Sequence, residues 1–478
     1  MNKKLSMRKY NKMKAKNIYK IIVVIALPLI LQGCFVAKNY NRPEVETEAL
    51  YRTDQLPQDS LSLASVSWKE LFTDPILKSH IEKGLSNNLD IRVALETVAI
   101  AQAYVKQGKA GYFPSLSATS SFTRTKNSEN SQFGSFFSEP LEQYELSAAL
   151  SWEADVWGKI RSNKRAANAS YLQSVAAHQA VKTQLVAALA DTYYQLMALD
   201  SQKKIAEETL AARKSSLETT LALKEAGQVT EVAVKQTEAQ VHTTEIIVID
   251  LENNIKLLEN TFSILLAEAP QAIERGSLEQ QDLNPELQTG VPYLLLANRP
   301  DVMQSEFNLI NTFELTNVAR SSLYPSLTLT ASGGFQSLEF DNWIDASSLF
   351  STLIGSLTQP IFNQRKLRTQ LEVAKAQQEQ AFLNYKKSLL TAGQEVSNAL
   401  YNYEAETKKL KARKQELEAY ALAENYSEEL LNNGLANYLE VLTARQNALN
   451  SELNLIDSKY GQLSATVELY RALGGGWR

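Results

Sequence analysis

The segment Tyr112-Phe113-Pro114-Ser115-Leu116 decides the fold, because it recurs as Leu323-Tyr324-Pro325-Ser326-Leu327, 211 residues further along the chain. Beyond it, the Gly227 turn matches the Gly434 turn at a shift of 207 residues. Self-similarity at a nearly fixed spacing is the signature of a repeated structural unit. We therefore interpret the chain as two copies of one unit. Each copy contains a helix, two strands, a very long helix, a glycine turn and another helix.

The very long helices follow from missing helix breakers. The 68 residues between Gly158 and Gly227 contain neither Gly nor Pro, and a helix of that length would extend about 100 Å. In the helices after the two glycine turns, apolar side chains are spaced alternately three and four residues apart. This period of 3.5 residues predicts coiled-coil packing against a neighbour. The seams are Val248, Leu251, Ile255, Leu258, Phe262 and Leu265, and then Leu439, Leu442, Gln446, Leu449, Leu453, Ile456, Tyr460, Leu463, Val467 and Tyr470.

The expected organisation has four parts. An N-terminal signal occupies 1–33, and a lipid-anchored segment with an equatorial region occupies 34–86. The first repeat covers 87–286, with a helix, strands at about 113–155, a long helix over 158–226 and a helix over 228–268. The second repeat covers 287–478, with a helix over 293–322, strands at about 325–360, a long helix over 363–433 and a helix over 435–473.

The N-terminal segment has the pattern of a secretory signal. The first 20 residues contain eight Lys or Arg and no acid, and Ile21 to Leu31 is uncharged. An apolar run of 11 residues is too short to span a membrane, which takes about 20. Leu31-Gln32-Gly33-Cys34 resembles a bacterial lipobox, so Cys34 is the expected lipidation site, with palmitate as an expected acyl chain. The alternative is a plain signal peptide with an incidental Cys. Translation that starts at Met1, Met7 or Met13 fits equally.

Composition argues against several function classes. Without the eight cations of the leader, 41 Lys and Arg remain against 53 Asp and Glu, a formal charge of −12 for 34–478. Backbone phosphates need a positive face, so nucleic acid is not an expected partner. The three His (His80, His178 and His242) lie far apart, and the zinc and nucleotide motifs CxxC, HExxH and GxGxxG do not occur. We expect no enzyme activity, no metal and no cofactor.

Four stretches alternate in side-chain character and are long enough to be tilted membrane strands: Ser115–Arg124, Tyr144–Trp152, Leu327–Phe335 and Ser348–Pro360. Periodicity alone leaves a half-buried sheet of a soluble protein as an equal alternative. Four strands cannot close a membrane barrel, since the smallest have about eight, and lipid does not tolerate an open sheet edge. If the strands cross a membrane, several protomers must share one barrel, and three would supply twelve strands.

These features together resemble the TolC-like outer-membrane efflux family, specifically its lipid-anchored OprM/NodT branch. The likeness runs from Cys34 to Arg478 and is strong because short motifs follow one another in order. They are Tyr40-Asn41-Arg42-Pro43, Trp68 to Pro75, Tyr112 to Leu116, Trp152 to Gly158, Arg299-Pro300-Asp301-Val302, Pro360-Ile361-Phe362, Gly434 to Leu442 and Ala472 to Trp477.

The resemblance implies a mixed α/β membrane protein in the outer membrane. It would be a homotrimer, in which long helices form a periplasmic α-barrel and four strands per protomer form a shared 12-stranded β-barrel. Its expected partners are a periplasmic adaptor (membrane fusion protein), an inner-membrane RND-type pump and outer-membrane lipid. It would pass drugs or other small solutes outward without chemistry of its own. The alternatives are a duct for type I protein secretion or metal-ion efflux, and a lipid-anchored periplasmic coiled-coil scaffold.

The resemblance also implies two functional regions. In the family, acidic side chains narrow the periplasmic mouth, and Glu440 occupies such a position, with Thr443 where many members carry a second acid. Glu440 and Thr443, with steric help from Tyr438, are the candidate gate; the alternative for Glu440 is a solvated helix face. The adaptor would contact the helical turns at Gly227, Gln228, Gly434 and Leu435, although the glycines also serve simply as helix caps.

Overall fold

The computed structural model describes residues 36–45, 50, 52, 62–132, 134, 139–281 and 295–478. The expected signal over 1–33 and Cys34 lie outside these residues. The chain divides into two compact units. Unit 1 takes Met1–Pro43, Ala99–Gln173 and Glu306–Asn384, and unit 2 takes Glu44–Val98, Ser174–Ser305 and Tyr385–Arg478. These units do not coincide with the two sequence repeats, because each long helix contributes its first part to unit 1 and the rest to unit 2.

The elements follow one another as the two repeats require. The strands are β1 (Ser115–Thr125), β2 (Leu141–Ala154), β3 (Ser326–Ser337) and β4 (Leu349–Thr358). The long helices are α5 (Lys159–Glu225), α6 (Glu231–Leu265), α9 (Lys366–Asn432) and α10 (Tyr438–Ala472). The shorter elements are η2 (Leu63–Ser65), α2 (Trp68–Leu71), α3 (Pro75–Asn87), α4 (Leu89–Ala110), η3 (Leu278–Gln280), α7 (Leu295–Asn298), α8 (Pro300–Ser321) and η5 (Ala346–Ser348). The expected fold class, long helices with four strands, is confirmed.

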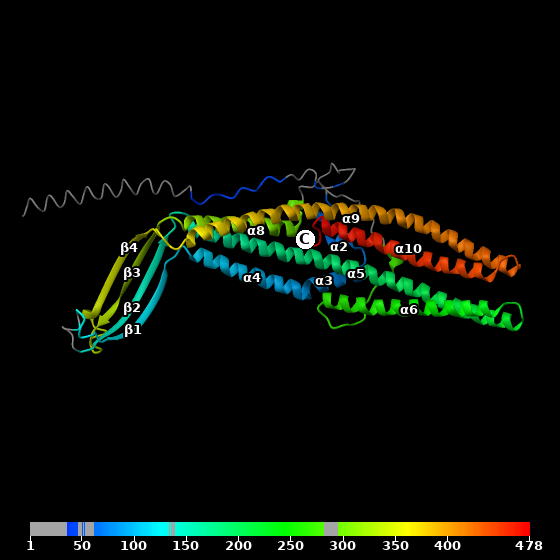
Figure 1. The fold of residues 1–478 in the computed structure, drawn as a ribbon, viewed down its shortest axis with the longest axis horizontal. Helices are drawn as coiled ribbons and strands as arrows, with labels where there is room; N and C mark the ends of the chain where they lie inside the picture. The colour runs from blue at the N-terminus through cyan, green and yellow to red at the C-terminus, as the bar shows by residue number, and fades with distance from the viewer. Residues whose placement is uncertain are drawn as a thin grey trace, which may run out of the picture. The chain divides into compact units, whose positions relative to one another are not determined.

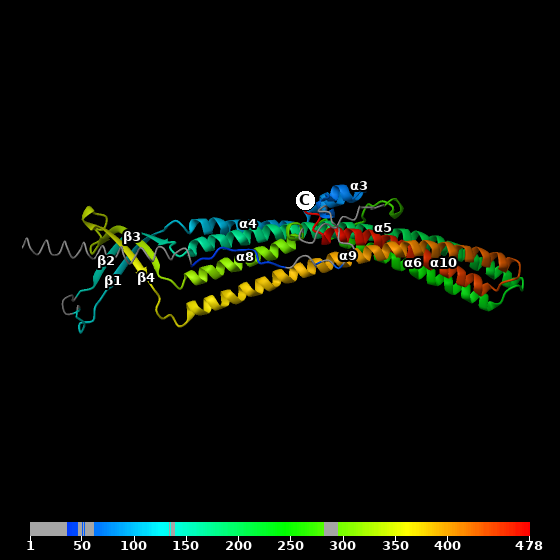
Figure 2. The same cartoon turned by 90° about the horizontal axis from the view of Figure 1, so that it is seen from above.

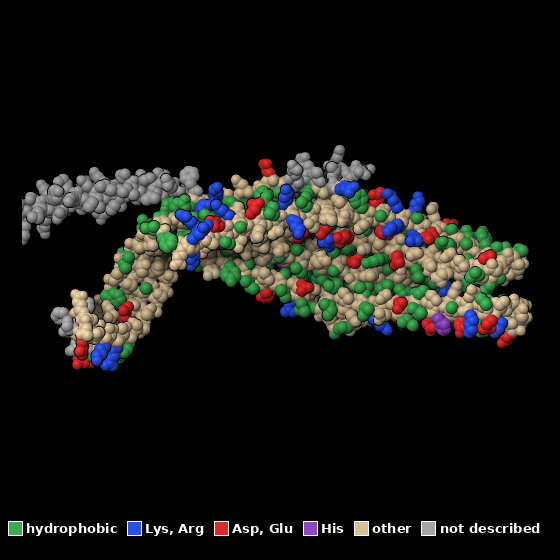
Figure 3. Space-filling model, in the orientation of Figure 1, with side chains coloured by type: hydrophobic (Ala, Val, Ile, Leu, Met, Phe, Trp, Pro, Cys, Tyr) green, Lys and Arg blue, Asp and Glu red, His purple; other side chains and the backbone are tan. Residues whose placement is uncertain are grey.

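Unit 1 contains one antiparallel sheet in the order β1-β2-β3-β4 (Figure 1). Its register aligns apolar side chains across the strands: Leu116 lies opposite Leu150, Leu150 opposite Ala331, and Ala331 opposite Leu353. Since side chains alternate between the two faces of a strand, this row places its members on one face. Few charged side chains lie over the middle of the visible face of the sheet in Figure 3. β1 and β4 form the edges of the sheet, and among the described residues each pairs with a strand on one side only.

The first described residues of unit 1 lie along α8. Arg42 donates to both carboxylate oxygens of the buried Glu306, at 2.6 and 2.7 Å. The Lys38 backbone exchanges two hydrogen bonds with the Asn317 side chain, which accepts from Lys38 N and donates to Lys38 O. A bidentate Arg–carboxylate pair and a two-way amide contact fix position and orientation together. The segment over 36–43 is therefore held on α8.

Unit 2 contains two helical hairpins, formed by the later part of α5 with α6 and the later part of α9 with α10. α5 and α9 each have 67 residues, so each extends about 100 Å. α6 and α10 lie beside each other (Figure 2). Most seam residues expected from the 3.5-residue period are buried or half-buried, whereas Leu439 at the turn is 56% exposed. Among the described residues, no helix is both long enough and apolar enough to cross a membrane.

Several helix boundaries differ from expectation; α9, for example, begins at Lys366 and not at 363. The single helix expected over 293–322 is two helices, α7 and α8, which separate at Arg299 because Pro300 cannot donate an intrahelical hydrogen bond. Arg299 is 4% exposed and donates to the carbonyl of Ala472. The helices after the glycine turns begin at Glu231 and Tyr438, three residues later than expected, because Thr230 and Asn437 occupy the N-cap positions in extended conformation.

Candidate functional site at the hairpin turns

The two hairpin turns have the same backbone geometry. Gly227 and Gly434 both have φ of 72°, in the left-handed region that favours glycine. Gly434 N donates to Leu431 O and Leu435 N to Leu430 O, and the first turn repeats this pair of bonds one hairpin earlier. This is the Schellman motif, which satisfies carbonyls at a helix end and reverses the chain. Gln228 and Leu435 follow the glycines and are exposed, Leu435 at 76%.

Glu440 lies in the first turn of α10 and is exposed. Its backbone N–H donates to Asn437 Oδ1 at 3.1 Å, and its carboxylate accepts from Asn437 Nδ2 at 2.9 Å. This reciprocal pair is a variant of the capping box, with Asn in place of Ser or Thr. The side chain also lies in the first turn of the helix, where acidic residues stabilise a helix through its dipole. Glu440 thus has a structural role as a capping residue, and its exposure leaves the carboxylate in contact with solvent.

Tyr438 connects the two hairpins. Its hydroxyl lies 3.0 Å from the hydroxyl of Thr220 on α5 and 3.0 Å from that of Thr237 on α6. Both threonines are only 2% exposed. The hydroxyl group of Tyr438 is therefore held between two helices of the other hairpin. Thr443, one turn further along α10, is exposed and donates to the carbonyl of Leu439 at 2.9 Å.

A buried arginine extends this connection away from the turns. Arg213 of α5 is 3% exposed; it donates to Thr244 Oγ1 at 2.7 Å, to the carbonyl of Gln240 at 3.1 Å and to Gln446 Oε1 of α10 at 3.1 Å. Its Nε has no hydrogen-bond partner among the described residues. Burial, with the nearby Arg445 cation, lowers the pKa of Arg213. An incompletely satisfied buried cation is held by its surroundings at a cost in stability.

Arg445 of α10 completes the connection. Its guanidinium donates to Glu428 of α9 at 2.9 and 2.5 Å and to Ser216 of α5 at 2.7 Å. Glu424 lies 3.7 Å away, and burial raises the pKa of its carboxyl group. We call the set around these contacts the hairpin cluster. Its members are Arg213, Ser216, Thr220, Thr237, Thr244, Glu424, Glu428, Tyr438, Arg445 and Gln446.

The sequence-predicted site residues are only partly brought together. Tyr438, Glu440 and Thr443 share the first two turns of α10, and Leu435 precedes them by one short loop. The structure adds the other members of the hairpin cluster, which sequence reasoning missed. A useful signal was available at Gln446, the one frankly polar residue in the apolar seam of α10, because a polar seam residue calls for a polar partner on the facing helix.

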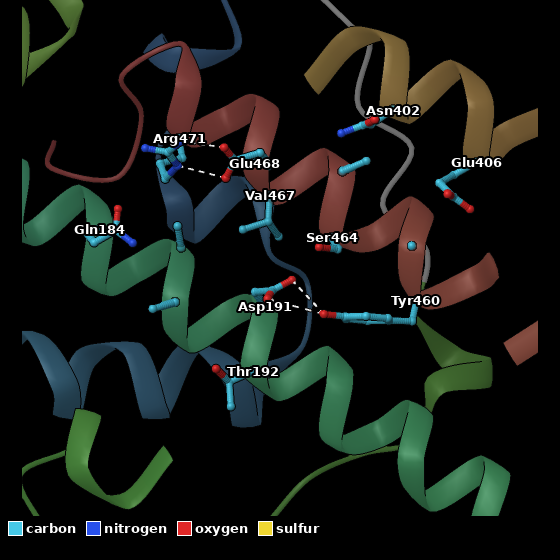
Figure 4. Close-up of a pocket in the computed structure, with 14 residues that line it drawn as sticks. Gln184, Asp191, Thr192, Asn402, Glu406, Tyr460, Ser464, Val467, Glu468 and Arg471 are labelled. Atoms are coloured by element: carbon cyan, nitrogen blue, oxygen red, sulfur yellow. Dashed lines mark hydrogen bonds and ion pairs between the residues drawn. The ribbon is translucent and has the colours of Figure 1, made fainter. Parts of the chain in front are cut away.

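A second polar region lies further along the hairpins. A hollow of about 640 Å³ is lined by α5, α9 and α10 (Figure 4). In it, the Tyr460 hydroxyl lies 3.3 and 3.4 Å from the two oxygens of Asp191, and Arg471 forms an ion pair with Glu468. The lining contains no Cys, His or Lys. Among the described residues, no cluster of three or more His, Cys, Asp or Glu is arranged to hold a metal ion.

This architecture and its sequence match a known protein family. The family model described as outer membrane efflux protein matches residues 80–267 and 291–475. The chain is 29% identical over 466 residues to the solvent efflux pump outer membrane protein SrpC of Pseudomonas putida, covering 96% of this chain and 98% of the relative. It is 26% identical over 462 residues to the cation efflux system protein CusC of Escherichia coli, covering 96% and 99%.

Solved structures agree with these sequence matches. The outer-membrane channel OprN superposes with a TM-score of 0.85 at 25% identity, covering 92% of this chain and 99% of OprN. The structure of CusC gives a TM-score of 0.80 at 25% identity and the same coverage. The sequence repeats, the four-stranded sheet and the paired long hairpins therefore have one explanation: the chain belongs to the outer membrane efflux protein family.

Proposed function

We propose that this protein is the outer-membrane exit channel of an efflux system that passes drugs or other small solutes out of the cell. The observation that carries the proposal is the joining, in one chain, of a sheet with an apolar face and two edge strands to two helices of about 100 Å. A wall of this kind encloses a passage only after it is closed into a ring. The channel does no chemistry, and a partner pump supplies the energy.

The ring is a homotrimer. Four strands per copy are too few to close a membrane barrel, and lipid does not tolerate the free edges of β1 and β4. Three copies supply twelve strands and leave no edge unpaired. The same threefold arrangement would place the hairpins of three copies around one axis, as a periplasmic α-barrel.

The hairpin turns are the surface for a periplasmic adaptor, which connects the channel to an RND-type pump in the inner membrane. Leu435 is 76% exposed beside Gly434, and a large apolar side chain at a turn is a ready contact for a partner. The first turn offers the polar Gln228 instead. Partners of this kind fit the names of the relatives, which are components of an efflux pump and of a cation efflux system. A metal ion therefore remains a second candidate cargo.

The hairpin cluster and Glu440 form the gate. A mouth built from two hairpins per copy opens when one hairpin moves relative to the other, and the contacts of Tyr438, Arg213 and Arg445 oppose that movement. Glu440 is exposed near the turn. In a threefold ring, three such carboxylates repel one another and attract cations. The gate thus combines hydrogen-bonded ties within each copy with a ring of negative charge.

Cys34 carries the lipid anchor in the outer membrane. It lies two residues before the segment that Arg42 and Lys38 hold on α8. A lipid on Cys34 would then be positioned by contacts with the folded chain. A single acyl chain binds membranes weakly, so the anchor adds to the hold that the barrel provides.

Planar bilayer recording of the purified full chain in detergent tests the channel function. Insertion should give discrete conductance steps, and the protein in micelles should have the mass of three chains. A matched sample denatured before addition serves as the control. A folded protein that is monomeric and gives no conductance would contradict the proposal and favour the periplasmic scaffold.

A further inference from the structure

The two halves of the sheet in unit 1 are related by fixed sequence shifts. β1 pairs with β2 with Leu116 opposite Leu150, and β3 pairs with β4 with Leu327 opposite Leu357. Adding 211 to each residue number of β1 and 207 to each residue number of β2 converts the β1–β2 register into the β3–β4 register. The sequence repeat gives the same two numbers, 211 at the Pro-Ser-Leu motifs and 207 at the glycine turns. The repeat therefore holds in the strand register as well as in the sequence.

The shift of 207 also relates the segments that follow β2 and β4. α5 begins at Lys159 and α9 at Lys366, which differ by 207. Gly158 has φ of 77°, and Arg365, which differs from it by 207, has φ of 66°. A non-glycine residue in the left-handed region is uncommon, so this match is a specific one. The residue directly before the long helix thus has a left-handed conformation in both halves, and the second corner adds another such residue, Gln364.

One ladder of the sheet has no counterpart within the chain. β2 pairs with β3 from Tyr144 opposite Ser337 to Ala154 opposite Leu327. Applying the same shifts turns this ladder into one between β4, over 351–361, and β1, over 116–126. Within one chain these two strands are the opposite edges of the sheet. The missing ladder must join β4 of one copy to β1 of the next.

We infer that, in the assembled ring, β4 of one copy pairs antiparallel with β1 of the next copy in one register, with Leu357 opposite Ser120 and Ile361 opposite Leu116. This pairing lengthens β4 beyond Thr358 to Ile361. The inference rests on the shared sheet of the proposed function and deepens it by naming which backbone residues of the second copy meet.

Exposure within the single chain agrees with this interface. Ile361 is 97% exposed and Leu116 is 74% exposed, although the equivalent ends of β2 and β3 are paired. β4 ends three residues before Ile361, whereas the equivalent residue of β2, Ala154, still lies in its strand. A strand ends early when it lacks a partner, and a second copy supplies one.

The face of each side chain supports the same register. Leu116, Ser120, Leu353 and Leu357 all lie on the face that carries the aligned apolar row. A register changed by one residue would turn the apolar residues of the incoming strand to the opposite face. Pro360 lacks an N–H, but a ladder toward one neighbour uses alternate residues, so Pro360 is tolerated between Gln359 and Ile361. Registers that differ by an odd number of residues are excluded because they put the apolar side chains on the wrong face. Among the remaining registers, the sequence repeat selects one.

Disulfide trapping tests this register in the full chain. The double variant Ser120→Cys with Leu357→Cys places the two thiols directly opposite across the interface, where Cα atoms are about 4.5–5.5 Å apart. Two matched variants keep Leu357→Cys and use Ala118→Cys or Phe122→Cys, each displaced by two residues on the same face. Parent and single-cysteine variants control for Cys34. Mild oxidation followed by denaturing gel electrophoresis without reductant reads out covalent multimers.

We expect the Ser120–Leu357 pair to form covalent dimers and trimers at least tenfold faster than either displaced pair. Faster trapping by a displaced pair, in a parent that is trimeric by mass in micelles, would overturn the register and leave the channel function standing. A parent that is monomeric by mass would instead refute the shared sheet itself. Equal trapping by all three pairs would mean an interface without a fixed register and would also overturn the inference.

Discussion

Replacing Tyr438 with Phe tests the proposed tie between the two hairpins. The substitution keeps the ring and removes only the hydroxyl, which lies 3.0 Å from both the Thr220 and the Thr237 hydroxyls. Each intramolecular hydrogen bond contributes about 1 kcal/mol net. Losing both should cost the tied arrangement at most about 2 kcal/mol in each copy. The threonines limit the cost, because each also bonds to a carbonyl of its own helix, Ser216 or Ala233.

This upper limit of about 2 kcal/mol corresponds to a factor of at most about 30 in the ratio of released to tied hairpins, since 1.4 kcal/mol is tenfold. Single-channel recording in planar bilayers should show more time in high-conductance levels for Tyr438→Phe than for the parent. Tyr426→Phe is the matched control, because Tyr426 is 59% exposed on α9. Identical records for the parent and Tyr438→Phe would refute the tie. An equal gain in Tyr426→Phe would show that the effect does not depend on the buried contact.

Three further outcomes are expected. Glu440→Gln should reduce cation selectivity in bilayers, whereas the exposed Glu429→Gln on α9 should not; equal selectivity in all three proteins would remove Glu440 from the gate. Burial raises the pKa of Tyr470 to about 12, above its ordinary 10. Because the unfolded chain loses this proton first, stability is retained below pH 10 and falls by at most about 2.7 kcal/mol as pH rises through 12, visible in urea midpoints; Tyr470→Phe should weaken this loss. Cys34→Ser should remove the mass that the lipid adds to the mature chain, as measured by intact mass spectrometry. If the variant keeps the same added mass as the parent, the lipid is attached at another residue.

The fold could be predicted from the sequence because its signals are long and repeated. Sixty-eight residues without Gly or Pro leave few alternatives to a helix, and strands placed twice at the same spacing support each other. Boundaries were harder to predict. The break at Arg299 depends on Pro300, and the late starts of α6 and α10 depend on single capping residues, Thr230 and Asn437. Such choices are decided by single residues, which periodicity does not record.

The candidate site was predicted less completely. Glu440 and the two turns were identified, and their roles stay predictions. Tyr438 was expected to act by steric bulk, whereas the structure places its hydroxyl between two buried threonines. The burial of Arg213 could not be predicted from the sequence, because a cation in a long polar helix is ordinarily solvated. It is buried where α5 packs against α6 and α10, and this tertiary contact leaves no local pattern in the sequence.

The Schellman turns have a consequence for chemical protein synthesis. A Cβ atom built on Gly227 or Gly434 would meet nothing within 4 Å, so glycine is favoured at these positions by the positive φ angle and not by a lack of space. L-alanine is disfavoured at φ of 72°, whereas its mirror-image enantiomer adopts that angle readily. A semisynthetic chain with D-alanine at Gly434 should keep its fold and rigidify the loop, which makes stereochemistry a way to stiffen the hairpin turn.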